Sequence, residues 1–91
     1  MNLITSFLGK DGQIFGRDER IFSEIGINNI TDDNKQKIRE YIEGFLDSKG
    51  EIEILKADNE KIIVSTIDIK KVIVKENYLG GEKLEINVKW S

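Results

Sequence analysis

The chain has 91 residues, a net charge of −3, and no cysteine, histidine or proline. This length predicts a single domain, residues 1–91, with one modest core. The lack of cysteine excludes disulfides and thiolate metal sites, and the lack of histidine removes the commonest general base and transition-metal ligand. We therefore expect no catalytic residue, no metal and no cofactor.

The composition also bears on origin and location. Sixteen isoleucines and many lysines and asparagines are typical of AT-rich coding DNA, which indicates a low-GC bacterium or one of its mobile elements. Residues 1–8 lack the basic start and long apolar run of a signal peptide. No stretch approaches the roughly 20 apolar residues of a membrane span. We expect a cytoplasmic protein that does not contact a membrane.

The first thirty residues predict a hairpin and an irregular connector. Residues 2–8 suit a strand with Leu3, Thr5 and Phe7 on one side. The turn chemistry of residues 9–12 (Gly-Lys-Asp-Gly) then leads into a returning strand at residues 13–17. Residues 21–27 are apolar again and fit either a strand or a short helical turn.

Residues 32–48 predict an amphipathic helix. Thr31 can cap the free amides, and acidic Asp32 and Asp33 favour the positive end of the helix dipole. Gly50 is a natural stop just beyond the end. The apolar stripe repeats at helical spacing and comprises Ile38, Tyr41, Ile42, Phe45 and Leu46.

The last forty residues predict an antiparallel sheet. Short strand patterns cover residues 51–56, 61–69, 72–76 and 83–90, and in the last of these every second residue from Leu84 to Trp90 is apolar. The alternation changes phase near residue 70, which predicts a bulge or a single helical turn. The expected fold is α+β: an N-terminal β-hairpin and one helix packed on a C-terminal antiparallel sheet of 3–4 strands. Curling into a small SH3-like barrel is the alternative.

Three patterns in the sequence bear on possible functional sites. The four residues 9–12 match the loop of a KH domain, but that loop joins two helices, so a hairpin turn is the better interpretation. An EF-hand loop that starts at Asp11 would place Phe15 and Phe22 where oxygen ligands are required. A hydrolase with two carboxylates is a third class, and it would need a closely spaced acid pair in a pocket.

For function, the sequence favours a non-catalytic protein-interaction module, such as an inhibitor from a phage or mobile element that binds a host protein. The predicted protein interface is Tyr78, Leu79 and Trp90, because exposed aromatic residues are enriched at binding hot spots. Residues 83–90 are predicted to be an edge strand that could pair with a second copy, although Lys83 and Lys89 disfavour such pairing.

The alternative is a small nucleic-acid or nucleotide-binding β-barrel. This function would require basic side chains to gather beside Tyr78 or Trp90, where bases could stack. No basic block stands out along the chain, which disfavours nucleic acid as the partner. The lysines concerned are Lys70, Lys71, Lys75 and Lys89.

Overall fold

The computed structural model describes residues 3–77 and 80–88, which form one antiparallel sheet of six strands and one α-helix. The strands are β1 (Ile4–Leu8), β2 (Ile14–Asp18), β3 (Glu51–Leu55), β4 (Lys61–Ser65), β5 (Lys71–Lys75) and β6 (Lys83–Asn87), and the helix is α1 (Lys35–Ser48). The described chain also contains three short 3₁₀ turns: η1 (Lys10–Gly12), η2 (Ser23–Ile25) and η3 (Thr66–Asp68).

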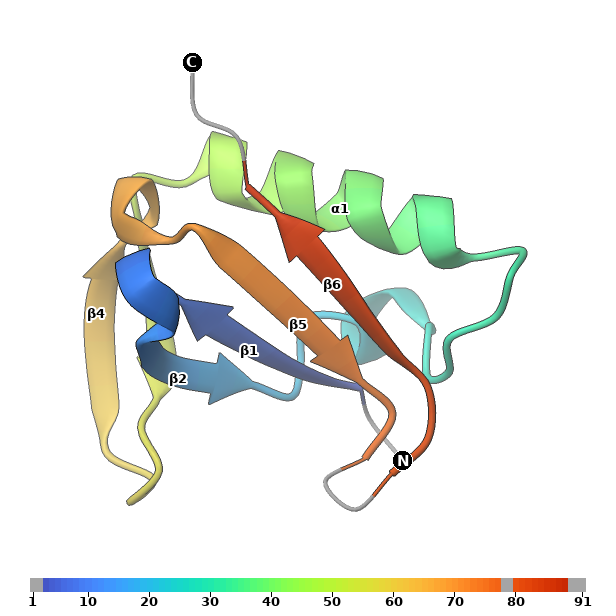
Figure 1. Ribbon diagram of the computed structural model, residues 1–91, viewed down its shortest axis with the longest axis horizontal. Coiled ribbons are helices and arrows are strands. Elements are labelled where there is room, and N and C mark those ends of the chain that lie inside the picture. The colour runs from blue at the N-terminus through green and yellow to red at the C-terminus, as the bar shows by residue number, and fades with distance from the viewer. Residues whose placement is uncertain (1–2, 78–79, 89–91) are drawn as a thin grey trace.

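The sheet consists of three hairpins side by side, in the strand order β4-β3-β2-β1-β5-β6 (Figure 1). The N-terminal hairpin β1–β2 is the centre, β3–β4 lies beside β2, and β5–β6 lies beside β1. The α+β class is confirmed, but the expected C-terminal sheet of 3–4 strands is wrong. The N-terminal hairpin separates the two C-terminal hairpins and makes one larger sheet with them.

The sheet is open. β4 and β6 stand at opposite ends of the strand order, and no described strand pairs with both of them. The expected SH3-like barrel is therefore not confirmed. The phase change predicted near residue 70 corresponds to η3, a single 3₁₀ turn between β4 and β5.

The helix α1 covers one face of the sheet (Figure 1). Thr31 Oγ1 accepts a hydrogen bond from the Asn34 amide, while Asn34 Oδ1 accepts one from the Thr31 amide, so this pair caps the start reciprocally. The predicted stripe is confirmed: Ile38, Ile42 and Leu46 are buried, and Tyr41 and Phe45 are half-buried against the core. The predicted end near residue 48 is confirmed as well.

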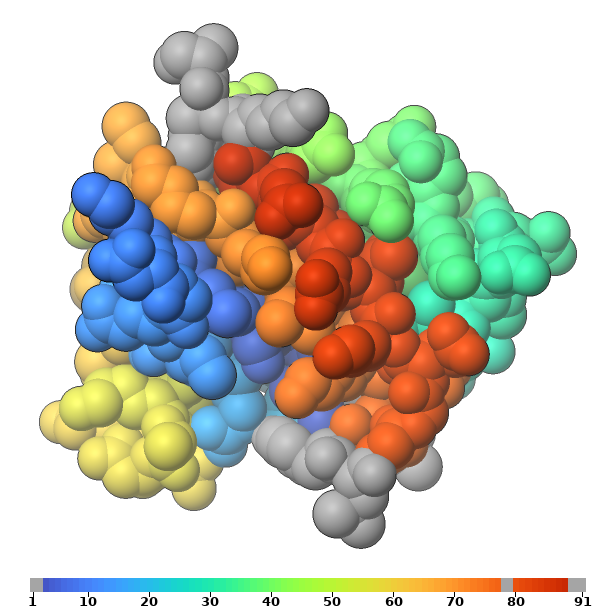
Figure 2. Space-filling model, viewed as in Figure 1, coloured from blue at the N-terminus to red at the C-terminus, as the bar shows by residue number. Residues whose placement is uncertain are grey.

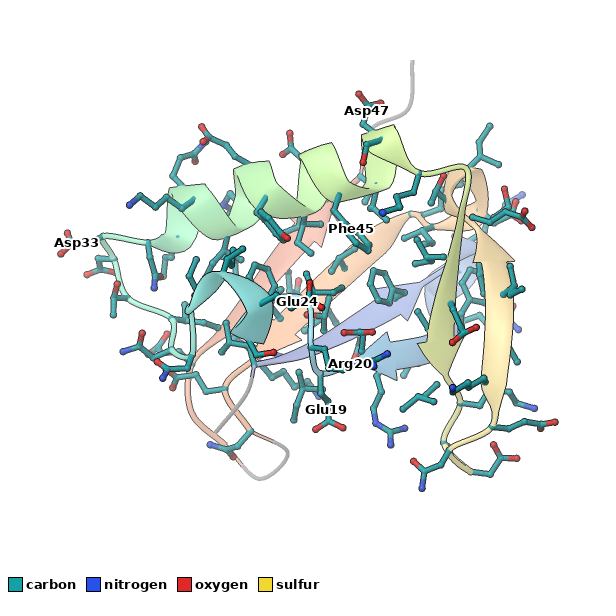
Figure 3. The ribbon with its side chains drawn as sticks, turned by 180° about the vertical axis from the view of Figure 1, so that it is seen from behind. Glu19, Arg20, Glu24, Asp33, Phe45 and Asp47 are labelled. Carbon is teal, nitrogen blue, oxygen red and sulfur yellow. The ribbon has the colours of Figure 1, made fainter. Side chains whose placement is uncertain are left out.

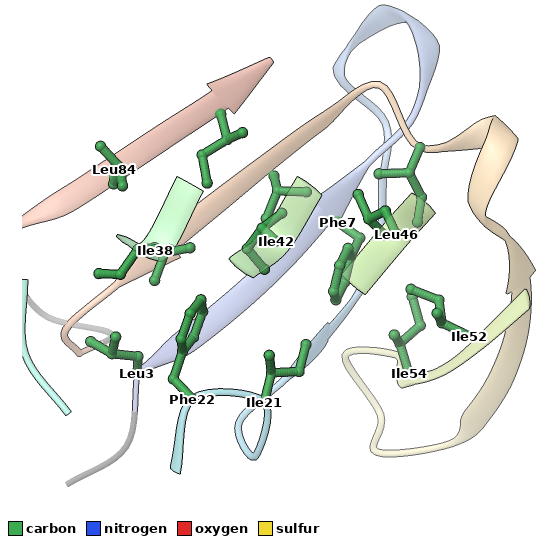
Figure 4. Packing of buried hydrophobic residues seen from close by; sticks show 14 of the residues in the cluster. Leu3, Phe7, Ile21, Phe22, Ile38, Ile42, Leu46, Ile52, Ile54 and Leu84 are labelled. Carbon is green, nitrogen blue, oxygen red and sulfur yellow. The ribbon is translucent and has the colours of Figure 1, made fainter. Parts of the chain in front are cut away.

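The core lies between α1 and the inner face of the sheet (Figure 4). Period-2 alternation places Phe7 of β1, Val72 and Val74 of β5, and Ile86 of β6 on this face, each at most 1% exposed. Phe22, at the start of η2, fills the space beside Leu3 and α1 and packs on Tyr41 with ring centroids 5.6 Å apart. The core therefore draws on segments from all along the chain.

β2 and β3 are joined by fewer facing residue pairs than any other two neighbouring strands of the described sheet. A single pair of facing residues, Arg17 and Leu55, joins the two strands, whereas five such pairs join β5 to β6. Gly16 permits the close approach, because a Cβ there would lie 2.5 Å from the Leu55 carbonyl oxygen. The β3–β4 hairpin is consequently the least firmly attached part of the sheet.

Candidate interaction surface

The predicted interface residues Tyr78, Leu79 and Trp90 all lie outside the described residues. The structure does describe the residues on either side of Tyr78 and Leu79. Glu76 Oε2 accepts the Ile30 amide and Glu76 Oε1 accepts the Glu82 amide, each at 2.9 Å. These two backbone hydrogen bonds, to Ile30 and then to Glu82, lower the pKa of Glu76. Glu76 therefore ties the β5–β6 hairpin to the segment that precedes α1.

The lysines of the nucleic-acid alternative are only partly brought together. Lys71 and Lys75 alternate with the buried valines of β5 and so lie on the outer face of the sheet, the face that α1 does not cover. The Lys70 ammonium instead donates a hydrogen bond to the Ile67 carbonyl. Lys89 lies outside the described residues. Lys83 of β6 stands opposite Lys75 and adds a basic group that the sequence alone did not place there.

The other candidate motifs have structural roles. Residues 9–12 form the η1 turn between β1 and β2, so the hairpin interpretation is confirmed and no helices flank that loop. Within residues 3–77 and 80–88, no three acidic side chains cluster as a metal site would require. Asp18 Oδ1 accepts the amides of Arg20 and Ile21, which accounts for its position after β2.

Large apolar side chains are exposed along one edge of the sheet. Ile63 of β4 is 67% exposed, and Ile67 of η3, which follows directly, is 61% exposed. Ile62 and Val64 alternate with Ile63 and are half-buried on the inner face. β4 is thus an edge strand with apolar groups on both faces and one charged residue, Lys61, at its start.

The backbone of β4 also presents unpaired groups. The Lys56 amide donates a hydrogen bond to the Glu60 carbonyl, and the Thr66 amide donates one to the Gly50 carbonyl. These two hydrogen bonds lie at the two ends of the β3–β4 pairing. Hydrogen-bonded and non-hydrogen-bonded pairs alternate in an antiparallel ladder. The backbone N–H and C=O groups of Ile62 and Val64 are therefore the ones that form hydrogen bonds with β3. The N–H and C=O groups of Lys61, Ile63 and Ser65 therefore point away from the sheet.

The opposite edge, β6, is protected. The same alternation points the N–H and C=O groups of Lys83, Glu85 and Asn87 outwards. Arg39 of α1 approaches the Glu85 carbonyl at 3.5 Å, and the Glu85 carboxylate lies 3.8 Å from Lys71 and 4.0 Å from Lys83. Charged side chains and the nearby helix deter pairing with another strand.

A space-filling view shows the outer face over β5 and β6, with no other described element on top of these strands (Figure 2). From behind, α1 crosses in front of the sheet, with Phe45 on its sheet side and Asp47 on its far side (Figure 3). The acidic hollow between α1 and β6 is lined by Glu40, Glu43 and Asp47. β4 carries one charged side chain, Lys61, whose ammonium lies 3.9 Å from the carboxylate of Glu53 on β3, so this edge has fewer charged groups than β6.

Arg17 adds side-chain hydrogen bonds between β2 and the β3–β4 hairpin, whose Ile52 and Ile54 are also buried in the core. The Arg17 guanidinium donates hydrogen bonds from Nη1 to the Lys56 carbonyl at 2.9 Å and from Nη2 to Asn59 Oδ1. Arg17 Nε lies 3.8 Å from Glu19 Oε2, which is an ion pair but too long for a hydrogen bond. This arginine orients the free edge relative to the rest of the sheet.

No family model matches the chain, and neither a curated protein nor a solved structure matches it. The geometry of the described residues is therefore the only basis for assigning this surface a role.

Proposed function

We propose that the protein is a non-catalytic protein-interaction module that binds by accepting an additional strand at β4. The main support is the outward-pointing backbone of Lys61, Ile63 and Ser65. In strand addition these groups supply affinity, and side chains of alternate residues supply specificity.

The side chains of β4 fit this role. Ile63 is 67% exposed on the outer face, and Ile62 and Val64 have only half-buried side chains on the inner face. An added strand would cover part of each, and the burial of apolar surface stabilises the complex by about 25 cal/mol per Å². A role as an inhibitor encoded by a phage or mobile element stays a proposal that only the composition supports.

A photo-crosslinking amino acid at position 63 tests this function, with position 87 on β6 as the matched control. Both residues face outwards from the middle or end of an edge strand. The protein would be irradiated in the cells that produce it, and the adducts would be identified by mass spectrometry. Adducts to protein at position 63 but not at 87 are expected. No adduct at 63, or equal yields at both positions, would contradict strand addition at β4.

Nucleic-acid binding is the second candidate, and one observation favours it. Lys71, Lys75 and Lys83 lie together on the outer face, where Glu85 offsets part of their charge. A labelled single strand would then bind at low salt and lose affinity steeply as salt is raised. Lack of binding at low salt would eliminate this candidate.

A further inference from the structure

On the basis of the function proposed above, we propose that the strand added at β4 is the β4 strand of a second copy of this chain. The two strands would run antiparallel around a two-fold axis that passes between the two copies of Ile63. The result is one continuous sheet shared by the two copies, with the same surface of each copy in the interface.

The residue order of β4 suits this symmetric arrangement. With Ile63 on the axis, Lys61 of one copy lies opposite Ser65 of the other, and both are among the residues whose backbone groups point outwards. All three outward-facing residues therefore find hydrogen-bonding partners in the same register. Neither Pro nor a bulge interrupts the strand.

The inner face matches in the same register. Ile62 of one copy would lie opposite Val64 of the other, and the reverse pair completes the symmetry. These side chains flank Ile52 and Ile54 of β3, which belong to the buried core. Pairing would thus join the two cores through β-branched side chains, which pack well across strands.

The outer face supplies complementary charge. Ile63 would meet Ile63 of the second copy, with the Glu53 side chains one strand further out on each side. Lys61 pairs with Glu53 of its own copy at 3.9 Å and would stand beside the small Ser65 of the second copy. Glu51 of the second copy lies next in that row, about 10 Å from Lys61 between Cα atoms. Glu51 makes no ion pair with any other described residue. A lysine can reach that carboxylate across the serine.

Full-length pairing of β6 with itself is less favourable. The symmetric register would place Glu85 directly opposite Glu85 of the second copy, and like charges in facing positions are destabilising. Arg39 Nη1 also lies 3.5 Å from the Glu85 carbonyl oxygen, which a second strand would need as an acceptor. The charge pattern therefore selects β4 over β6 for self-association.

Single-cysteine variants test the register, because the natural chain contains no cysteine. Facing residues of a hydrogen-bonded antiparallel pair have Cα atoms about 5.5 Å apart, within the range of a disulfide. Ile63→Cys should therefore form a disulfide-linked dimer under mild oxidation. Lys61→Cys is the matched control on the same strand and face, because its two copies would lie about 14 Å apart.

The expected yield of linked dimer from Lys61→Cys is at least about tenfold below that from Ile63→Cys, since disulfides need Cα atoms within about 7 Å. Equal yields, or no linked product from Ile63→Cys, would overturn the proposed pairing. A position-63 photo-adduct to a different protein would also overturn it while leaving strand addition at β4 intact.

Ser65→Pro disrupts the interface without disturbing the fold of one copy. Ser65 has φ = −69°, which proline adopts naturally, and its amide points away from β3. The natural chain should sediment at twice its mass of 10.4 kDa, and the variant should sediment at 10.4 kDa with an unchanged circular dichroism spectrum. A natural chain that stays monomeric at all concentrations, or a variant that still dimerises, would refute self-pairing.

Discussion

β4 and β6 are the two edges of one sheet, and they meet solvent in different ways. β6 continues a hairpin that five residue pairs attach to β5, and its outward residues are charged or polar. β4 belongs to a hairpin that one residue pair attaches to β2, and its central outward residue is Ile63. Both edges expose backbone groups, but β6 carries two charged residues against one on β4, and Arg39 of α1 approaches its backbone.

The difference shows that edge protection in this protein is local. α1 contacts the β6 edge through Arg39, and this side of the sheet is also tied to the chain before α1 through Glu76. On the β4 side, the charged groups beside Ile63 are Lys61 of the same strand and the facing Glu53 of β3, which pair with each other at 3.9 Å. The hairpin that is joined to its neighbour by one residue pair also carries the strand we propose as the binding edge, so attachment of the hairpin and binding at β4 should depend on the same few residues.

The largest expected effect comes from Gly16→Ala at the β2–β3 junction. The new Cβ would lie 2.5 Å from the Leu55 carbonyl oxygen, so β3 must shift. We expect the free energy of unfolding to fall by about 1–3 kcal/mol. Denaturant unfolding measures this loss, and hydrogen exchange should show β3–β4 losing more protection than β5–β6.

Gly44→Ala in α1 is the matched control, because its added Cβ meets nothing within 4 Å. It should gain about 1 kcal/mol from helix propensity. If Gly16→Ala were neutral, or if both hairpins lost protection equally, the weak attachment of β3–β4 would be wrong.

Thr5→Val should stabilise the whole sheet, both the β2–β3–β4 side and the β5–β6 side of β1. Thr5 lies on the central strand β1, opposite Asp18 on one side and Val74 on the other, and is fully buried. Its hydroxyl has no hydrogen-bond partner among the described residues. Replacing an unsatisfied hydroxyl with a methyl group of similar shape should raise the free energy of unfolding by about 1–2 kcal/mol.

Thermal unfolding measures the effect of Thr5→Val. A gain confined to one hairpin in hydrogen exchange would contradict the central role of β1. A loss of stability would show that the hydroxyl has a partner after all.

Arg17→Ala should loosen the β3–β4 hairpin by a smaller amount. It removes hydrogen bonds to the Lys56 carbonyl and to Asn59, all at exposed positions. We expect a loss of about 0.5–1 kcal/mol, since these groups can bond to water instead. Arg39→Ala at the β6 edge should cost less, because its contact with Glu85 is long at 3.5 Å. An equal or larger cost for Arg39→Ala would reverse the comparison.

The smallest expected effect is a pH dependence confined to the β5–β6 side. The folded state lowers the pKa of Glu76, so its contribution to stability is present at neutral pH. It is lost as pH falls below about 4 and through the folded pKa. Melting temperature measured between neutral and acidic pH should fall more for the natural chain than for Glu76→Gln. Identical pH profiles would remove Glu76 as the cause.

Local signals in the sequence predicted the helix and the strands well. Residues 31–50 combine a cap, a stripe at helical spacing and a stop, and each acts within a few residues of chain. A bulge or helical turn is predicted near residue 70, and the structure has a 3₁₀ turn, η3, slightly earlier at Thr66–Asp68, so the strand predicted over 61–69 ends at Ser65. Such features depend on neighbouring residues and so can be read without knowing the fold.

The binding edge was predicted less well. Residues 83–90 were expected to be an edge strand, and β6 is confirmed as one over Lys83–Asn87. The alternation pattern does not single out β4 as an edge, although Ile62, Ile63 and Val64 place apolar groups on both faces of one strand. That run is the signal that could have identified it. Tyr78, Leu79 and Trp90 stay a prediction, because they lie outside the described residues.

The sequence by itself determined which segments are extended, which one is helical, and which side of each faces the core, because apolar periodicity acts residue by residue. Only the tertiary structure decided the neighbours of each strand. β1 pairs with β5 across more than sixty residues of chain and thereby places the N-terminal hairpin in the middle. Alternation is the same whichever strand lies beside another, so it cannot specify which strands end at the edges. That choice made β4 and β6 the two edges of the sheet.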